Sequence, residues 1–253
     1  VLLTGGVDLS LGSVVALTGV VAACFAHPGQ FPLVVPVFLG VAAGTACGLA
    51  NGLVITRGKV APFVVTLGMM TVARGLGLVV SGGKPVSDLS QPFKVIGGDL
   101  FGFPIPILIL GAVAVISWVF LANTRLGRYV YAVGGNELAA LASGINVHGV
   151  KLLAYTVCGA LAGLAGVVLA SRITTGQPNA GVAYELDAIA AVVIGGTSLS
   201  GGSGGVGGTL LGALLIGVIN NGLDLLNVSS YYQQIVKGLI IVGAVWLDKR
   251  HEK

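Results

Sequence analysis

The feature that most constrains the fold is a series of apolar runs that are too long for an ordinary protein core. Of the 253 residues, 55% are hydrophobic and 9% are charged, whereas soluble domains carry about 25% charged residues. So few charged residues cannot cover a surface that faces water. A spanning β-barrel would show short segments of alternating polarity, but these runs are unbroken. The sequence therefore predicts an all-α integral membrane protein, a polytopic bundle of helices.

Eight apolar segments are expected to cross the membrane, if one short segment is counted. They are residues 9–26, 33–56, 60–81, 104–122, 152–171, 188–195, 206–226 and 235–247. A helix needs about 20 residues to cross the hydrocarbon core, so residues 188–195 are too few to cross alone.

Basic residues give the expected orientation, because loops rich in Lys and Arg stay in the cytoplasm. The basic loop at Arg57 and Lys59, the stretch 123–151 and the C-terminal tail are accordingly predicted to be cytoplasmic. The loops that are then expected outside are residues 82–103, 172–187 and 227–234.

Glycine is abundant, with 42 residues, and several glycines recur every four residues. The second segment carries Gly40, Gly44, Gly48 and Gly52, and the fifth carries Gly159 and Gly163. Such spacing predicts close packing between membrane helices.

Several kinds of chemistry lack their sequence signals. The three cysteines have no CxxC spacing, the three histidines are far apart, and no Walker A pattern occurs. ATP, if it drives this protein, must therefore bind another chain. Gly202, Gly204 and Gly207 match GxGxxG, but they lie between membrane segments and not in a strand–turn–helix unit. They predict a connector that is flexible or tightly packed.

The longest polar break is the stretch 123–151, which is expected to contain a short helix outside the membrane. Asn136 can cap this helix and Gly144 can end it. Leu138, Leu141, Ala142 and Ile145 then form one apolar stripe. The pattern indicates a helix that offers one face to a partner; the alternative is an ordinary loop with a helical turn.

A few polar residues lie in or near the apolar segments, where each is costly unless it has a use. The candidates for a path through the bundle are Asp8, Ser10, Asn51, Arg74, Asn220 and Asn221. Two alternatives remain open. Arg74 could extend its side chain to the outer interface, and the two asparagines could form hydrogen bonds between helices.

Four motifs, in order along the chain, resemble the permease subunits of bacterial ABC importers for simple sugars, and most of all the ribose type. The motifs are GGVDLSLGSVVALTG at 5–19, TRLGRYVYAVGGNELAALASGINV at 124–147, YELDAIAAVVIGGTSLSGG at 184–202 and NNGLDLLNVSSYYQQIVKG at 220–238. The resemblance runs from Gly5 to about Asp248, which is nearly the whole chain.

The resemblance implies a permease of the bacterial inner membrane that works with other subunits. These are a second permease copy, a cytoplasmic ATP-binding subunit and a periplasmic sugar-binding protein that delivers a monosaccharide. ATP and Mg would bind the ATPase subunit, so this chain is expected to hold no cofactor, to bind no nucleic acid and not to be an enzyme. Family members have about ten spans, so the resemblance also implies that about two N-terminal spans are missing from the single permease domain 1–253.

The resemblance also assigns roles to residues. The family's coupling helix, which faces the ATPase, corresponds to a Glu-Ala-Ala…Gly pattern in which Leu138 is an extra residue. The expected ATPase-coupling residues are Arg125, Arg128, Asn136, Glu137, Leu138, Ala139, Ala140, Leu141, Gly144 and Ile145. Arg172, Glu185 and Asp187 are expected near the docking binding protein, with a solvated rim as the alternative.

Other functions stay open at this point. An ion-coupled secondary transporter would need paired carboxylates in its spans, and a membrane enzyme would need a catalytic cluster; neither pattern is visible. Within the importer class, the solute could also be xylose, arabinose, galactose, a furanose signal molecule or, more distantly, a branched-chain amino acid.

Overall fold

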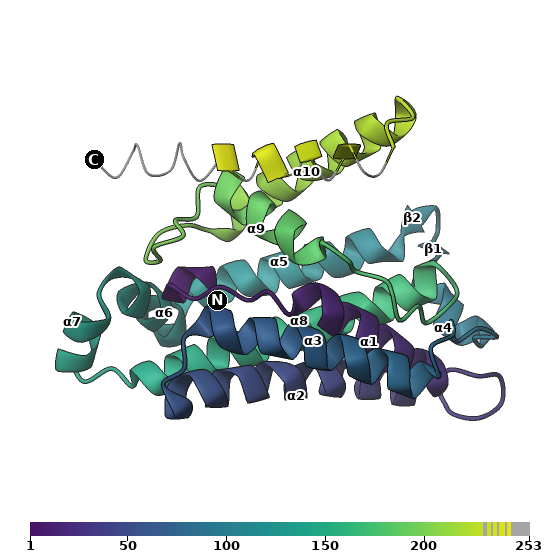
Figure 1. Ribbon diagram of the computed structural model, residues 1–253, viewed down its shortest axis with the longest axis horizontal. Helices are drawn as coiled ribbons and strands as arrows, with labels where there is room; N and C mark the ends of the chain where they lie inside the picture. The colour runs from purple at the N-terminus through teal and green to yellow at the C-terminus, as the bar shows by residue number, and fades with distance from the viewer. Residues whose placement is uncertain (230–231, 234, 237, 241, 244–253) are drawn as a thin grey trace. The chain divides into compact units, whose positions relative to one another are not determined.

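The structure, a computed structural model, describes residues 1–229, 232–233, 235–236, 238–240 and 242–243. Helices dominate it (Figure 1). The helices are η1 (Leu2–Thr4, a 3-10 turn), α1 (Leu11–Cys24), α2 (Val34–Gly58), α3 (Pro62–Ser81), α4 (Gln91–Val95), α5 (Ile105–Asn123), α6 (Arg125–Gly135), α7 (Glu137–Ala142), α8 (Val147–Arg172), α9 (Tyr184–Ile194) and α10 (Val206–Leu225). Two short strands, β1 (Asp99–Leu100) and β2 (Phe103–Pro104), pair antiparallel with Asp99 opposite Pro104.

The chain divides into two compact units, each described here by itself. The first unit comprises Val1, Val7–Val113 and His148–Val182, and the second comprises Leu2–Gly6, Ala114–Val147 and Ala183–Lys253. The helix α5 contributes residues to both units and has no buried residue in this single chain.

Within the first unit, α1, α2, α3 and α8 run side by side (Figure 1). The predicted glycine face of α2 packs on α8. A Cβ atom added at Gly44 would overlap the backbone of Gly159 and Gly163, and one at Gly48 would overlap the carbonyl of Tyr155. The glycines allow the two backbones to approach more closely than any side chain would permit. The predicted helix packing is confirmed.

The helix α1 is the centre of this bundle and is buried almost all round. Val14 and Leu17 belong to one apolar cluster with Ala73 of α3, and Ala22 belongs to another that includes Phe93 of α4. A helix that is apolar on every side is typical of the core of a large protein or of a membrane span. Helix α1 therefore holds its neighbours together.

In the second unit, α9 packs against α10 and α6 against α7 and η1. Glycines again allow close approach, because Cβ atoms at Gly195 and Gly208 would meet each other's backbones and one at Gly212 would meet the carbonyl of Ala191. The buried apolar residues between α9 and α10 are Ala190, Ala191 and Ile216.

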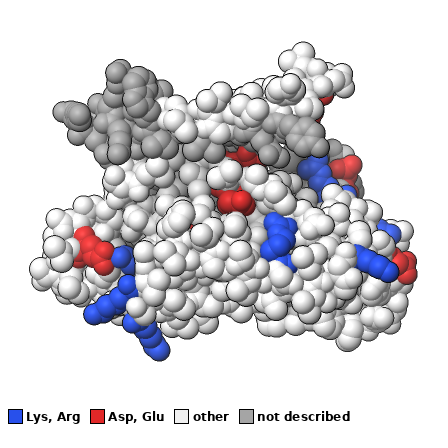
Figure 2. Space-filling model, in the orientation of Figure 1, with Lys and Arg blue, Asp and Glu red and all other residues white. Residues whose placement is uncertain are grey.

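Five helices of the described residues are long and apolar enough to cross a membrane. They are α2, α3, α5, α8 and α10. Helix α1 is apolar but has 14 residues, and α9 has 11. Figure 2 shows that most of the surface in view carries neither Lys, Arg, Asp nor Glu. The last expected span, residues 235–247, and the basic tail lie partly or wholly outside the described residues.

One boundary differs from the sequence expectation. Helix α8 begins at Val147, five residues before the predicted span, so His148 and Lys151 belong to its first turns and not to a polar loop. The loop 82–103 contains α4, and the β1–β2 pair lies at its end. Polar residues in the first turns of a long helix give no apolar signal, which explains why the sequence placed the helix start too late.

The α2–α8 packing makes a testable prediction. Gly44→Ala would place a Cβ atom against the Gly159 backbone, and overpacking of this kind costs ~1–3 kcal/mol. We expect a lower midpoint of thermal unfolding for the detergent-solubilised protein. The matched control is Gly68→Ala on α3, where a Cβ atom meets nothing within 4 Å; an equal loss in both variants would contradict the packing.

Candidate functional site

The short helix α7 has the caps that the sequence predicted. The Asn136 side chain accepts a hydrogen bond from the backbone N–H of Ala139 at 2.9 Å. At the other end Gly144 has φ +79°, and the N–H of Ile145 donates to the carbonyl of Ala140 at 3.1 Å. These bonds satisfy backbone groups that a helix leaves free at its termini. They fix the length of α7 at six residues.

The outer face of α7 is apolar and exposed. Leu138 is 79% exposed and Leu141 is 59% exposed, whereas Ala140 is buried within the second unit. Of the other stripe residues, Ala142 is exposed and Ile145 half-buried. Arg125, Arg128, Glu137 and Ala139 are exposed as well. Leu138 and Leu141 thus form a small exposed apolar surface on α7, with charged residues beside it.

The glycine-rich connector 195–205 is attached to α6, which the sequence did not predict. The Tyr131 hydroxyl donates to the carbonyl of Gly204 at 2.9 Å, and the N–H of Gly202 donates to the carbonyl of Leu3 at 3.0 Å. A Cβ atom at Gly134 would overlap both Leu3 and Gly202. The only sequence signal was a glycine pair in each partner, at 134–135 and 201–202.

Three of the predicted path residues meet in a buried polar cluster at the start of α1. Asp8 Oδ1 accepts the Ser10 N–H at 2.9 Å and the Ser10 hydroxyl at 2.6 Å, and Asn51 Nδ2 donates to Ser10 Oγ at 3.1 Å. Asp8 is 5% and Asn51 0% exposed. The hydrogen bond from Asn51 thus joins α2 to Ser10, the residue before α1.

Two polar atoms near this cluster have no hydrogen-bond partner among the described residues. They are Asn51 Oδ1 and the hydroxyl of Tyr155, which is 1% exposed and contacts α2 from α8. Buried polar atoms without a partner are costly and call for an explanation, such as a water or a ligand. Tyr155 was missed by the sequence analysis, because an aromatic residue in an apolar span looks like ordinary core.

Arg74 lies on α3 and points its guanidinium into the first unit. Nη1 donates to the carbonyls of Pro178 and Ala180, each at 2.8 Å. The charge is thus paired with two backbone dipoles of the segment between α8 and α9.

The remaining candidates are spread over the two units. Asn220 and Asn221 lie on α10; Asn220 Oδ1 is buried without a described partner, whereas Asn221 is exposed. Glu185 and Asp187 lie in the first turn of α9, where acidic residues suit the positive end of the helix dipole. Arg172 is the exposed last residue of α8, in the other unit.

No group of three or more His, Cys, Asp or Glu residues in the described part of the chain could hold a metal ion. Cys24, Cys47 and Cys158 are free thiols.

The buried cluster predicts a specific loss of stability. Ser10→Ala removes a hydrogen bond from buried Asp8 and the acceptor of Asn51 Nδ2, and leaving such groups unpaired costs about 1–3 kcal/mol each. We expect a lower thermal midpoint in detergent. Ser13→Ala is the control, since Ser13 is also buried on α1 but makes no side-chain hydrogen bond with described residues; if it costs as much, the cluster is not the cause.

Comparison with known proteins gives the family. Residues 1–245 match the family described as branched-chain amino acid transport system / permease component. The ribose import permease of Escherichia coli K12 is 48% identical over 259 residues, covering 100% of this chain and 80% of the relative. The ribose import permease of Bacillus subtilis is 51% identical over 253 residues, covering 99% and 78%.

A more distant relative is the D-allose transport system permease of E. coli, 40% identical over 249 residues and covering 98% of this chain and 76% of the relative. No solved structure matches the chain at a significant level. A family match over almost the whole chain and relatives near 50% identity agree, so this chain belongs to the branched-chain amino acid transport system / permease component family.

Proposed function

We propose that this protein is the membrane-spanning permease subunit of an ATP-driven, ABC-type importer of a monosaccharide, and that the sugar is ribose. The observation that carries the proposal is the identity of 48–51% with ribose import permeases over 98–100% of the chain. Permeases named for allose and arabinose are 38–40% identical, so the similarity decreases with a change of sugar.

The other subunits follow from this role. A periplasmic sugar-binding protein delivers the sugar, and a separate cytoplasmic subunit hydrolyses ATP with Mg. The permease lies in the bacterial inner membrane and works as a pair, with a second copy of the permease as the partner. The chain itself carries no reaction; it conducts the sugar.

Eight crossings fit this chain. Helices α1, α2, α3, α5, α8 and α10 each supply one. The last is expected from the apolar segment 235–247, part of which lies outside the described residues. The remaining crossing is the short apolar segment 188–195, most of which belongs to α9, and residues 172–187 then lie outside. The bond of Tyr131 to Gly204 supports this count, because it joins connector 195–205 to α6, which the basic residues orient to the cytoplasm.

Helix α7 is the coupling helix in this proposal. The ATPase subunit would cover Leu138 and Leu141, which are large, apolar and exposed, and Arg125 and Arg128 would fix the register. Removing apolar surface from water favours such a contact by about 25 cal/mol per Å². The caps at Asn136 and Gly144 keep the helix rigid, so that movement of the ATPase is passed to α6 and not absorbed by bending.

The cluster of Asp8, Ser10 and Asn51, together with Arg74, is proposed to line the sugar path; Asn220 and Asn221 are proposed to line it within the second unit. Arg172, Glu185 and Asp187 are proposed to receive the binding protein, because charged residues steer a partner and set its register.

One observation favours a second candidate function. Asp8 is a buried carboxylate, and so it could be one of the pair that an ion-coupled secondary transporter would need. The two candidates differ in their energy source. Uptake by reconstituted vesicles should be measured for a panel of sugars, with and without the ATPase and the binding protein. ATP-dependent uptake of ribose supports the importer, whereas uptake at full rate without the ATPase supports ion coupling and refutes the proposal.

The coupling role predicts the effect of Gly144→Val. A β-branched residue is disfavoured at φ +79°, so the end of α7 should be displaced. We expect ATP hydrolysis by the complex to continue while sugar uptake falls several-fold. Gly135→Val is the control, because a Cβ atom there meets nothing within 4 Å and φ is not positive. Normal uptake by Gly144→Val, with the protein present in the membrane, would contradict the role of α7.

A further inference from the structure

The segment between α8 and α9 does not stay at the end of the helical bundle. Beginning after Arg172, it turns back and runs along α1. A Cβ atom at Gly176 would meet Val20 and Ala23 of α1, and one at Gly181 would meet the backbone of Gly12. The rise of an α-helix from Gly12 to Val20 is about 12 Å. The segment thus follows more than half of α1, in the opposite direction.

This segment is not helical, so its backbone groups need other partners. Gly176 exchanges both backbone hydrogen bonds with Val86, at 2.9 and 2.8 Å. The N–H of Ala180 donates to the carbonyl of Gln177 at 3.1 Å in a turn. The guanidinium of Arg74 donates hydrogen bonds to the carbonyls of Pro178 and Ala180. Non-helical backbone at membrane depth occurs only where it is buried in protein or lines a water-filled cavity.

One face of this segment is not covered by the described residues of the first unit. Asn179 is exposed and Gln177 is half-buried, although Pro178 between them is fully buried. Lipid cannot hydrogen-bond an exposed asparagine, so the uncovered face of a segment at this depth must meet water. The alternation of a buried proline with polar neighbours gives the segment an inner side and a wet side.

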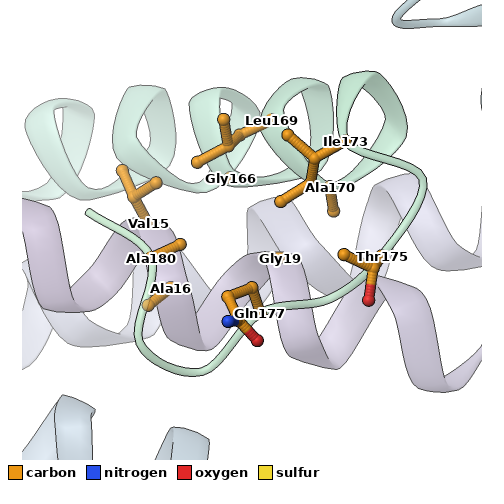
Figure 3. A pocket seen from close by; sticks show the side chains of 10 residues that line it. All are labelled: Val15, Ala16, Gly19, Gly166, Leu169, Ala170, Ile173, Thr175, Gln177 and Ala180. Carbon is orange, nitrogen blue, oxygen red and sulfur yellow. The ribbon is translucent and has the colours of Figure 1, made fainter. Parts of the chain in front are cut away.

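Gln177 also borders a small cavity of about 10 Å³, which is enough for one water molecule (Figure 3). The walls of the cavity come from α1, α8 and the segment itself, with Val15, Gly166 and Thr175 among the lining residues. Gln177 Oε1 is buried and has no hydrogen-bond partner among the described residues. The carboxamide of Gln177 therefore has an acceptor, Oε1, that no described residue uses.

We propose that residues 175–181 re-enter the bundle as a wall of the sugar path, and that the Gln177 carboxamide forms hydrogen bonds with the hydroxyl groups of a passing monosaccharide. The amide Nε2 can donate to a sugar hydroxyl, while the buried Oε1 can accept a hydrogen bond from one water molecule in the small cavity. A neutral amide suits this role, because it pairs with an uncharged polyol without holding it by charge. Arg74 is a positioning residue that acts through the carbonyls of Pro178 and Ala180.

The proposal rests on the proposed function, and its test uses the complete complex of permease, ATPase and binding protein in oriented vesicles. In a background of C24A, C47A and C158A, single cysteines replace Gln177, Asn179, Lys84 or Val72. The probe is a negatively charged, membrane-impermeant methanethiosulfonate added outside. Lys84 is an exposed residue of the 82–103 loop, and Val72 is an exposed apolar residue of α3 that lies close to Arg74 in sequence.

We expect the reagent to modify cysteine at 177, 179 and 84. It should not modify cysteine at 72, because we expect this exposed apolar position to face lipid. Ribose-loaded binding protein with ATP should slow modification at 177 several-fold and leave 84 unchanged, because only the path fills with sugar. No modification at 177 would contradict the proposal that residues 175–181 face water in the sugar path. Modification at 177 without protection would overturn the sugar contact.

Variants of Arg74 test its positioning role in the Gln177→Cys background. Arg74→Leu removes both donors and should change the modification rate at 177 several-fold, whereas Arg74→Lys keeps a donor and should restore it. Equal rates in the three proteins would show that Arg74 does not position the segment. Uptake by the unsubstituted complex is measured in parallel: if it imports no ribose, the proposed function fails, and if it does while 177 stays unmodified, this inference alone fails.

Discussion

Inside a membrane every backbone N–H and C=O needs a partner within the protein, because lipid offers none. Most of this chain meets the requirement with helices. Residues 173–183 do not: Gly176 exchanges backbone hydrogen bonds with Val86, and the guanidinium of Arg74 donates to the carbonyls of Pro178 and Ala180. A charged side chain inside an apolar unit is thus used to stabilise an exception to the helical rule. The exception is valuable because it brings polar groups into the bundle.

Glycine makes these arrangements possible in space. Between α2 and α8 it brings two helix backbones together, and at Gly176 and Gly181 it brings an irregular segment against α1. Close backbone approach increases van der Waals contact where no hydrophobic driving force acts between helices. Glycine therefore allows both the close packing of α2 on α8 and the close packing of the non-helical segment on α1. Cβ atoms at these positions would separate the elements that hold Arg74 and Gln177 in register.

The second unit uses the same devices for a different purpose. Helix α7 is too short to be stable by propensity, and its two caps and its packing on α6 make it a fixed projection. The Tyr131–Gly204 bond then ties α6 to the connector between α9 and α10. A force applied to Leu138 and Leu141 would reach α9 and α10 through hydrogen bonds and glycine contacts, with no flexible linker between them. The proposed coupling to a separate ATPase requires such a connection.

The sequence alone determined the elements that depend on neighbours along the chain. Apolar length predicted most spans, four-residue glycine spacing predicted the packed face of α2, and Asn136 and Gly144 predicted both ends of α7. Only the tertiary structure decided which polar groups meet. Arg74 and its two carbonyl partners are 104 and 106 residues apart, and Asn51 and Ser10 are 41 apart. A backbone carbonyl exists at every residue, so no sequence pattern can mark the one that a guanidinium will bind; that choice is made when the helices pack.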